Sequence, residues 1–261
     1  MAFRCRYCIL VSWFLCLFFK VSGQDIYTDE RSGIEISFPS GVNIFPRQWL
    51  YKKIHAEILP LCYGEHSRVE DILSRAFSKY PSGLLQDNLD KVYVTGAMKF
   101  YGLPYGGTNY HHSVYLTDDS GDPYFTDNYI EQVFHHEFSS ILIRYFDAYF
   151  DRMKWLSLNP SSFHYGNGGA EAIRNGQASM ELDPEFIAQG FLSRYSTASL
   201  EEDINVFAQN LFTGGSEFWR LVDLNDSIRE KTRILINFYH QLNPVFTESY
   251  FRSFYYNTAQ R

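Results

Sequence analysis

Residues 126–146 constrain the fold of this chain more than any other segment, because they match a single long helix. Thr126 or Asp127 can cap its start, and apolar side chains then recur along one stripe at helical spacing. The stripe consists of Ile130, Phe134, Ile141 and Tyr145. A helix of this length has to bury its stripe against another element, so the rest of the chain must supply a packing partner.

Strand and helix patterns flank this segment. Residues 91–101 and 108–117 are β-branched and aromatic, and we predict that they pair as antiparallel strands joined by a Gly/Pro loop. A helix is predicted from Ser67, its N-cap, and the C-terminal half contains further helical patterns. Those patterns start near residue 199 and continue over residues 216–224 and 226–241. The sequence therefore predicts an α+β fold, in which a small mixed or antiparallel sheet packs on the helix 126–146 and a mainly helical C-terminal half follows.

The first 23 residues have the features of a secretory signal peptide. Two arginines precede an uncharged and almost wholly apolar run over residues 8–19, and small residues that suit cleavage follow it. The run is shorter than the roughly 20 apolar residues of a usual membrane span, although an uncleaved anchor is the alternative. The bulky residues before Cys16 do not fit a lipid-anchor signal. We expect residues 1–23 to be a signal peptide and residues 24–261 to be one domain, exported to the periplasm, the cell surface or the extracellular space.

Charge and cysteine content exclude some functions. The chain has 23 basic and 30 acidic side chains, and removing the three basic residues of the signal leaves a net charge of 20 − 30 = −10. Such an acidic chain is a poor candidate for binding nucleic acid or anionic lipid. Cys62 is the one cysteine outside the predicted signal, so an internal disulfide cannot form.

The long helix contains the stretch VFHHEFSSIL. Read from His136, it is H-E-F-S-S, whereas a zinc peptidase helix carries H-E-x-x-H, with two histidines one turn apart on one face and a glutamate beside them. Ser140 stands at the position of the second histidine. His135 cannot replace it, because adjacent helical residues point about 100° apart.

Glu202 is the candidate for a further ligand from a later helix. Ser199 and Glu202 also form an S-x-x-E capping box, which explains the glutamate through the local backbone alone. An acidic residue in the first turn also complements the helix dipole. The sequence leaves both roles open.

Residues 190–212, GFLSRYSTASLEEDINVFAQNLF, resemble the third-ligand segment of gluzincin-type zinc metallopeptidases. In that segment a tyrosine, a short connection and an E-D-F-A-E-like helix start follow one another. The catalytic domain of anthrax lethal factor is similar, and its tyrosine-to-glutamate spacing matches that of Tyr195 and Glu202. The helix 126–146 is similar to the H-H-E-F-x-H-I-L helix of zinc-binding metallopeptidases of bacterial envelopes, many of them lipoproteins linked to nutrient import.

This resemblance implies a zincin-like domain with zinc as its cofactor. It implies His136 and Glu202 as metal ligands, Glu137 as the base that activates water, and Tyr195 as the group that stabilises the oxyanion. The strand 108–117 would be the edge that pairs with an extended peptide or protein. Association with an envelope import complex is the implied physiological setting.

The chain departs from the family pattern at three positions. Ser140 replaces a histidine, and Asn205 and Val206 stand where an alanine and a glutamate are usual. A neutral serine hydroxyl is a poor zinc donor, so the sequence predicts weakened or lost metal binding. Distant donors that could replace the missing histidine are His111, His112, His164 and Cys62.

Three functions follow from these departures. The first is a zinc metallopeptidase with a rebuilt ligand set, and the second is a non-catalytic binding protein of the bacterial envelope on the same fold. The third is an aromatic-rich glycan-binding or structural domain in which the motif matches arise by chance.

Overall fold

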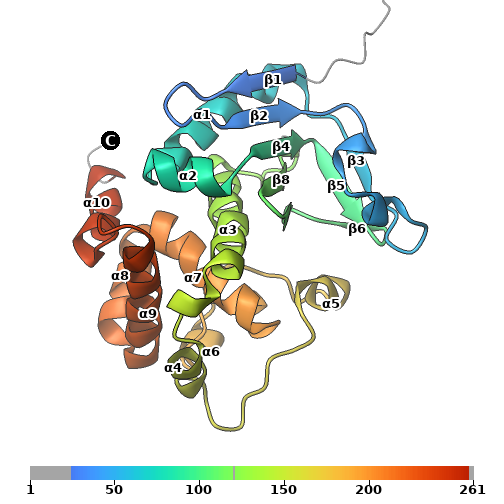
Figure 1. Cartoon of the computed structure of the whole chain (residues 1–261). Coiled ribbons are helices and arrows are strands. Elements are labelled where there is room, and N and C mark those ends of the chain that lie inside the picture. Colours follow the sequence, from blue (N-terminus) through green and yellow to red (C-terminus); the bar gives the residue numbers. More distant parts are fainter. Residues whose placement is uncertain (1–24, 120, 259–261) are drawn as a thin grey trace, which may run out of the picture.

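The computed structural model describes residues 25–119 and 121–258, which form an α+β fold (Figure 1). Its main sheet has five strands in the order β1-β2-β4-β8-β7. β1 and β2 are antiparallel, β2, β4 and β8 are parallel to one another, and β7 is antiparallel to β8. The strands are β1 (Asp25–Thr28), β2 (Glu35–Phe38), β4 (Lys91–Thr95), β7 (Gly107–Tyr110) and β8 (Ser113–Thr117). β7 is therefore an edge strand.

A second, antiparallel sheet has the strand order β3-β5-β6. Its strands are β3 (Glu57–Leu59), β5 (Ala97–Phe100) and β6 (Leu103–Pro104). Gly96 separates β4 from β5, and a Cβ atom there would lie 2.6 Å from the carbonyl oxygen of Pro60. The chain thus passes from one sheet to the other at a point where only glycine fits. A buried aromatic cluster that includes Phe100 of β5 and Tyr115 of β8 packs the two sheets together.

α3 (Asp127–Tyr145) is the central helix of the fold. The Thr126 side chain accepts a hydrogen bond from the Tyr129 amide at 3.2 Å, which confirms the predicted cap. Three residues of the predicted stripe are buried, whereas Tyr145 is 43% exposed. The helix is buried on most of its surface, because the main sheet and α1 (His66–Phe77) pack against it on one side and α7 (Leu200–Thr213) on another. The polar residues at its middle are consequently inside the molecule.

Helices dominate the chain after α3. α7 packs along α3, and α8, α9 and α10 pack on α7 and on one another away from the small sheet (Figure 1). The longer helices are α8 (Gly215–Leu224), α9 (Asp226–Leu242) and α10 (Glu248–Thr258). The shorter ones are α2 (Ser82–Asn88), α4 (Arg152–Ser157), α5 (Gly169–Arg174) and α6 (Pro184–Ile187).

The predicted pairing of residues 91–101 with 108–117 is wrong. Residues 91–95 pair with 113–117 in parallel, and residues 97–100 belong to the other sheet. Residues 108–117 are not one strand, because the chain reverses at His111, whose φ is 49°, and only β7 lies at the edge.

The start of α1 differs from the prediction. The predicted N-cap Ser67 is wrong, since α1 begins at His66 with Glu65 at the N-cap and no side-chain cap bond.

The predicted signal peptide, residues 1–23, lies outside the described residues. Among residues 25–119 and 121–258, no helix combines the length and hydropathy that crossing a membrane requires.

Candidate active site

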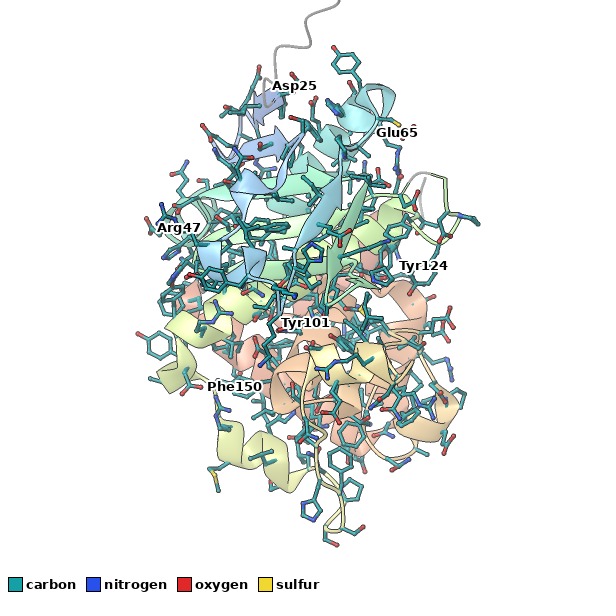
Figure 2. All side chains as sticks on the ribbon, turned by 90° about the vertical axis from the view of Figure 1, so that its right-hand side faces the viewer. Asp25, Arg47, Glu65, Tyr101, Tyr124 and Phe150 are labelled. Atoms are coloured by element: carbon teal, nitrogen blue, oxygen red, sulfur yellow. The ribbon has the colours of Figure 1, made fainter. Side chains whose placement is uncertain are left out.

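A groove of about 480 Å³, which we call the central groove, lies between the main sheet and the helical half. α3 and α7 line it together with β7 on one side and α5 on the other. Figure 2 shows this face of the molecule, with Tyr101 where the small sheet approaches α5, and the guanidinium of Arg174 lies 5.8 Å from the Tyr101 ring. The predicted site residues that line the groove are His136, Glu137, Ser140, Tyr195 and Glu202.

His136 and Glu202 are in direct contact, although 66 positions separate them in the chain. The Nε2 atom of His136 lies 3.0 Å from Oε2 of Glu202, and its Nδ1 atom lies 3.0 Å from Oε1 of Gln209. Both ring nitrogens therefore face oxygen acceptors. Burial alone would lower the pKa of His136, but the hydrogen bond and charge of Glu202 outweigh it and raise the pKa to about 9. In this arrangement His136 is a cation paired with a carboxylate.

Glu202 serves two purposes at once. Its backbone amide donates to the Ser199 side chain at 3.1 Å, which is the half of the capping box that Ser199 supplies. Its carboxylate turns to His136 instead. The cap and the contact with His136 are thus not alternatives, because the first uses the backbone of Glu202 and the second its side chain.

Glu137 is 8% exposed and lies beside this pair. Burial raises the pKa of its carboxyl group to about 7, and the charges of Glu202 and Glu201 act in the same direction, partly offset by His136 and a hydrogen bond from Asn109. The Asn109 side chain on β7 donates to Oε2 of Glu137 at 2.7 Å. Glu137 can therefore gain or lose a proton near neutral pH, as a general base must.

Tyr195 lies in a short 3-10 turn just before α7, with its hydroxyl directed at Glu202. Burial raises the pKa of this hydroxyl, and the charges of Glu202 and Glu137 raise it further, so it stays protonated and can donate. Gly169 of α5 lies against both groups, since a Cβ atom there would be 2.3 Å from the Tyr195 hydroxyl and from Oε1 of Glu202. α5 thus covers this end of the pair closely.

The side chains present do not fit a zinc site. His136 and Glu202 are two strong donors, and the third position, Ser140, offers a hydroxyl that donates to Glu201. In residues 25–119 and 121–258, no three His, Cys, Asp or Glu side chains are grouped so that they could hold a metal ion.

The distant candidates for the missing donor do not line the groove. The His112 ring stacks on Tyr145 at 4.6 Å and His111 packs on Tyr110, while Cys62 is exposed next to a 3-10 turn. His164 lines a separate pocket. His135 is fully buried with its ring 4.5 Å from that of Phe212. The prediction that His135 cannot replace the second histidine agrees with this placement.

Arg144 and Asn109 are polar residues of the groove that sequence reasoning missed. Arg144 donates to Oδ1 of Asn109 at 2.6 Å and lies 3.4 Å from the Ser140 hydroxyl. Asn109 thereby links Arg144 to Glu137. Helical spacing could have indicated Arg144, which is one turn after Ser140, but no local pattern indicates Asn109, because it reaches the groove only through the position of β7 at the sheet edge.

The fold and the groove define an α+β protein with a sheet edge, a central helix and a buried histidine–glutamate pair. No family model matches the sequence, and no curated protein matches it. Among solved structures, the chain is similar to a crystal structure from Bacteroides caccae ATCC 43185 described as a "putative zinc-binding metallo-peptidase". The TM-score is 0.52 at 15% identity, over 79% of this chain and 80% of that one. At this identity the similarity shows the fold alone.

Proposed function

We propose that the chain is an exported metallopeptidase-like protein whose central groove binds an extended peptide, and whose zinc site is incomplete. The observation that carries this proposal is the placement of Ser140. Its hydroxyl occupies the helical position of the second histidine and donates to Glu201, while His136 and Glu202 pair with each other. Glu137 and Tyr195 line the same groove, so the proposed catalytic groups remain without a complete ligand set.

Peptide binding is supported by the edge of the sheet. β7 has one free edge in the described sheet, and its residues Gly107, Thr108 and Asn109 line the groove. An extended peptide can add to such an edge through backbone hydrogen bonds. In this proposal β7, rather than all of residues 108–117, is the docking strand, and an envelope import complex is the proposed source of the bound segment.

Zinc titration of the unmodified protein and of the Ser140→His variant tests the proposal. His136 and residue 140 share a helical face, so an imidazole at position 140 adds a third strong donor to His136 and Glu202. We expect the variant to bind zinc at least tenfold more tightly in competition with a chelating dye. Ser157→His is the matched control, because residue 157 is exposed and does not line the groove.

Two outcomes of this titration contradict the proposal. Tight zinc binding with peptide cleavage by the unmodified protein would identify it as a zinc peptidase with another donor. Equal affinity of the Ser140→His variant and the unmodified protein would mean that His136 and Glu202 are not a partial zinc site.

Export is supported by the sequence of residues 1–23. We expect the secreted protein to begin near residue 24. Edman degradation of material from the culture medium or periplasm measures this directly, and an intact Met1 on protein that stays in the membrane fraction would contradict it.

A further inference from the structure

A second cavity of about 560 Å³, which we call the side pocket, adjoins the central groove at Tyr129. Tyr124, Tyr129 and Met180 line both the groove and the side pocket, so the two cavities are direct neighbours. The remaining wall of the side pocket comes from residues 181–182, the start of α3, the end of α7 and the start of α8. Figure 2 labels Tyr124 on the same face of the molecule as Tyr101.

The side pocket offers hydrogen-bond acceptors and negative charge. Glu181 and Glu217 are its carboxylates, and among the described residues that line it there is no lysine, arginine or histidine. Neither carboxylate forms an ion pair within residues 25–119 and 121–258. Burial raises the pKa of the Tyr124 hydroxyl, and the charge of Glu181 raises it further. The negative charge of Glu181 is therefore felt at Tyr124, which lines both the groove and the side pocket. The Tyr124 and Tyr129 rings are 4.7 Å apart and can receive a cation on their faces.

Asn205 also points to a ligand in the central groove. It lines the groove one helical turn after Glu202, is 2% exposed, and its Oδ1 atom has no hydrogen-bond partner in the described structure. A buried carbonyl oxygen without a partner destabilises the folded protein, and an N–H or O–H group of a ligand would relieve that cost. Asn205 is also a position at which the resembling family usually has alanine.

We infer that the groove selects a peptide with a lysine or arginine whose cationic end enters the side pocket, while Asn205 accepts a hydrogen bond from the same peptide. This inference rests on the proposed peptide binding. Along α3, Glu137 and Tyr129 are 137 − 129 = 8 positions apart, or about 12 Å at about 1.5 Å per residue. An extended peptide advances about 3.3 Å per residue, so the basic residue lies about four positions from the residue next to Glu137.

Fluorescence anisotropy with labelled decapeptides tests this selection. Each peptide has a background of alanine and threonine and one test residue. At every position tested, three peptides are compared, which carry lysine, glutamine or glutamate there, and the position of the test residue changes along the series. We expect the best lysine peptide to bind roughly fivefold tighter than its glutamine partner, with the glutamate peptide weakest. The double variant Glu181→Gln, Glu217→Gln should bind the lysine and glutamine peptides equally.

Glu185→Gln is the matched control, because Glu185 is exposed, forms no ion pair among the described residues and lines neither cavity. A lysine preference caused only by the net negative charge would also fall in the control, in proportion to one removed charge rather than two, and this outcome would overturn the inference. Asn205→Ala should weaken the lysine and glutamine peptides alike, by roughly threefold, with an unchanged lysine preference. Unchanged affinity of both peptides for the Asn205→Ala variant would overturn the role of Asn205.

The same measurements separate this inference from the proposed function. Peptides that bind without any preference for lysine would overturn the selection of a basic residue and leave peptide binding intact. Failure of every peptide to bind a folded protein would overturn the proposed function itself. A thermal unfolding curve for each variant establishes that it is folded before its affinity is compared.

Discussion

Single small residues determine how closely the walls of the central groove approach its polar groups. A Cβ atom on Gly107 would lie 2.3 Å from Cγ1 of Val133 and 3.0 Å from Oε1 of Glu137. On the opposite wall, Gly169 makes an equally close approach to Tyr195 and Glu202. Neither glycine needs a positive φ, since neither has one. Their role is therefore to leave room for the site residues.

Gly169→Ala is expected to disturb the site more than the fold. The new methyl group would meet the ends of two flexible side chains, Tyr195 and Glu202, which can rotate away. We predict a loss of less than about 1 kcal/mol in the free energy of unfolding, together with at least threefold weaker peptide binding. Urea unfolding and peptide anisotropy measure the two effects. Gly64→Ala is the control, because its Cβ atom would have no neighbour within 4 Å; a large loss of stability in Gly169→Ala alone would contradict the prediction.

The predicted site residues were indicated by a short local motif and by a family resemblance. His136 and Glu137 follow from the H-E pair, and the resemblance of residues 190–212 to the third-ligand segment of gluzincin-type metallopeptidases indicated Tyr195 and Glu202. The structure brings all four to one groove, while their chemical roles stay predictions. The neighbouring polar groups could not be found in this way, because Asn109 reaches Glu137 across a gap of 28 positions through the packing of β7 on α3.

At the scale of elements, α3 is held in place by polar contacts as well as by apolar packing. Nζ of Lys79, just after α1, lies 2.5 Å from Oε1 of Glu131, and the Tyr80 hydroxyl lies 2.8 Å from Nδ1 of His135. These contacts lie away from the groove, at the boundary between α1, α3 and the end of α7, where Lys79 also donates to the Phe212 carbonyl oxygen at 2.8 Å. The side chains of Lys79 and Glu131 are mostly buried, so their attraction is weakly screened.

Glu131→Gln should change how stability depends on pH. Burial acts to raise the pKa of Glu131, but His135 and Lys79 outweigh it and lower the pKa from 4.5 to about 2. A lowered folded pKa adds stability above the unfolded value of 4.5, which is lost as the pH falls from 4.5 toward 2. We expect the variant to be about 3 kcal/mol less stable at neutral pH and nearly equal to the unmodified protein near pH 2, as measured by urea unfolding.

His135 titrates in a pH range next to that of Glu131, so its contribution to the pH dependence of stability must be separated from that of Glu131. Burial lowers its pKa from 6.5 to about 4, so the unfolded chain takes up a proton first and stability falls as the pH drops from 6.5 to 4. The loss is larger in the Glu131→Gln variant, because the substitution removes the hydrogen bond and the charge that raise the pKa of His135. Glu185→Gln, an exposed position, should follow the unmodified curve. A Glu131→Gln variant whose deficit is the same at pH 7 and near pH 2 would show that Glu131 stabilises by packing alone.

Helices were easier to predict than strand pairing. Residues 216–224 and 226–241 match α8 and α9 closely, because apolar spacing within one segment determines a helix. The parallel pairing of β4 with β8 joins strands that are separated in the chain by β5 and β6 of the other sheet, so no local pattern indicates it. α10 was missed, although its apolar face packs on α7 and α8.

For the whole molecule, a buried ion pair joins the floor of the groove to the C-terminal helices. Asp203 follows Glu202 on α7, and its Oδ2 atom lies 2.8 Å from Nζ of Lys231 on α9. Both side chains are fully buried. Trp155 and Tyr165 donate to the same carboxylate oxygen at 2.9 and 2.7 Å. The position of α7, and with it the position of Glu202, therefore depends on contacts from three separate parts of the chain.

Lys231→Met should destabilise the whole domain, because it leaves the Asp203 carboxylate buried without a cation. Burial raises the pKa of Asp203 and lowers that of Lys231, so each charge depends on the other to stay ionised. Removing one partner of such a pair costs about 3 to 5 kcal/mol, which urea unfolding would measure as a lower midpoint. Lys154→Met, the same substitution at a lysine with 54% side-chain exposure and a 3.8 Å contact to Glu230, should cost less than about 1 kcal/mol.

The double variant Asp203→Asn, Lys231→Met decides whether lost charge pairing or lost packing is responsible. A neutral amide at 203 keeps acceptors for Trp155 and Tyr165 but no longer needs a cation, so part of the stability should return. Recovery of at least about 1 kcal/mol relative to Lys231→Met would assign the loss to the unpaired carboxylate. A double variant as unstable as the single one would assign it instead to the other contacts of the lysine ammonium group, which donates to the Gly190 carbonyl oxygen at 3.0 Å and packs 4.1 Å from the centre of the Phe191 ring.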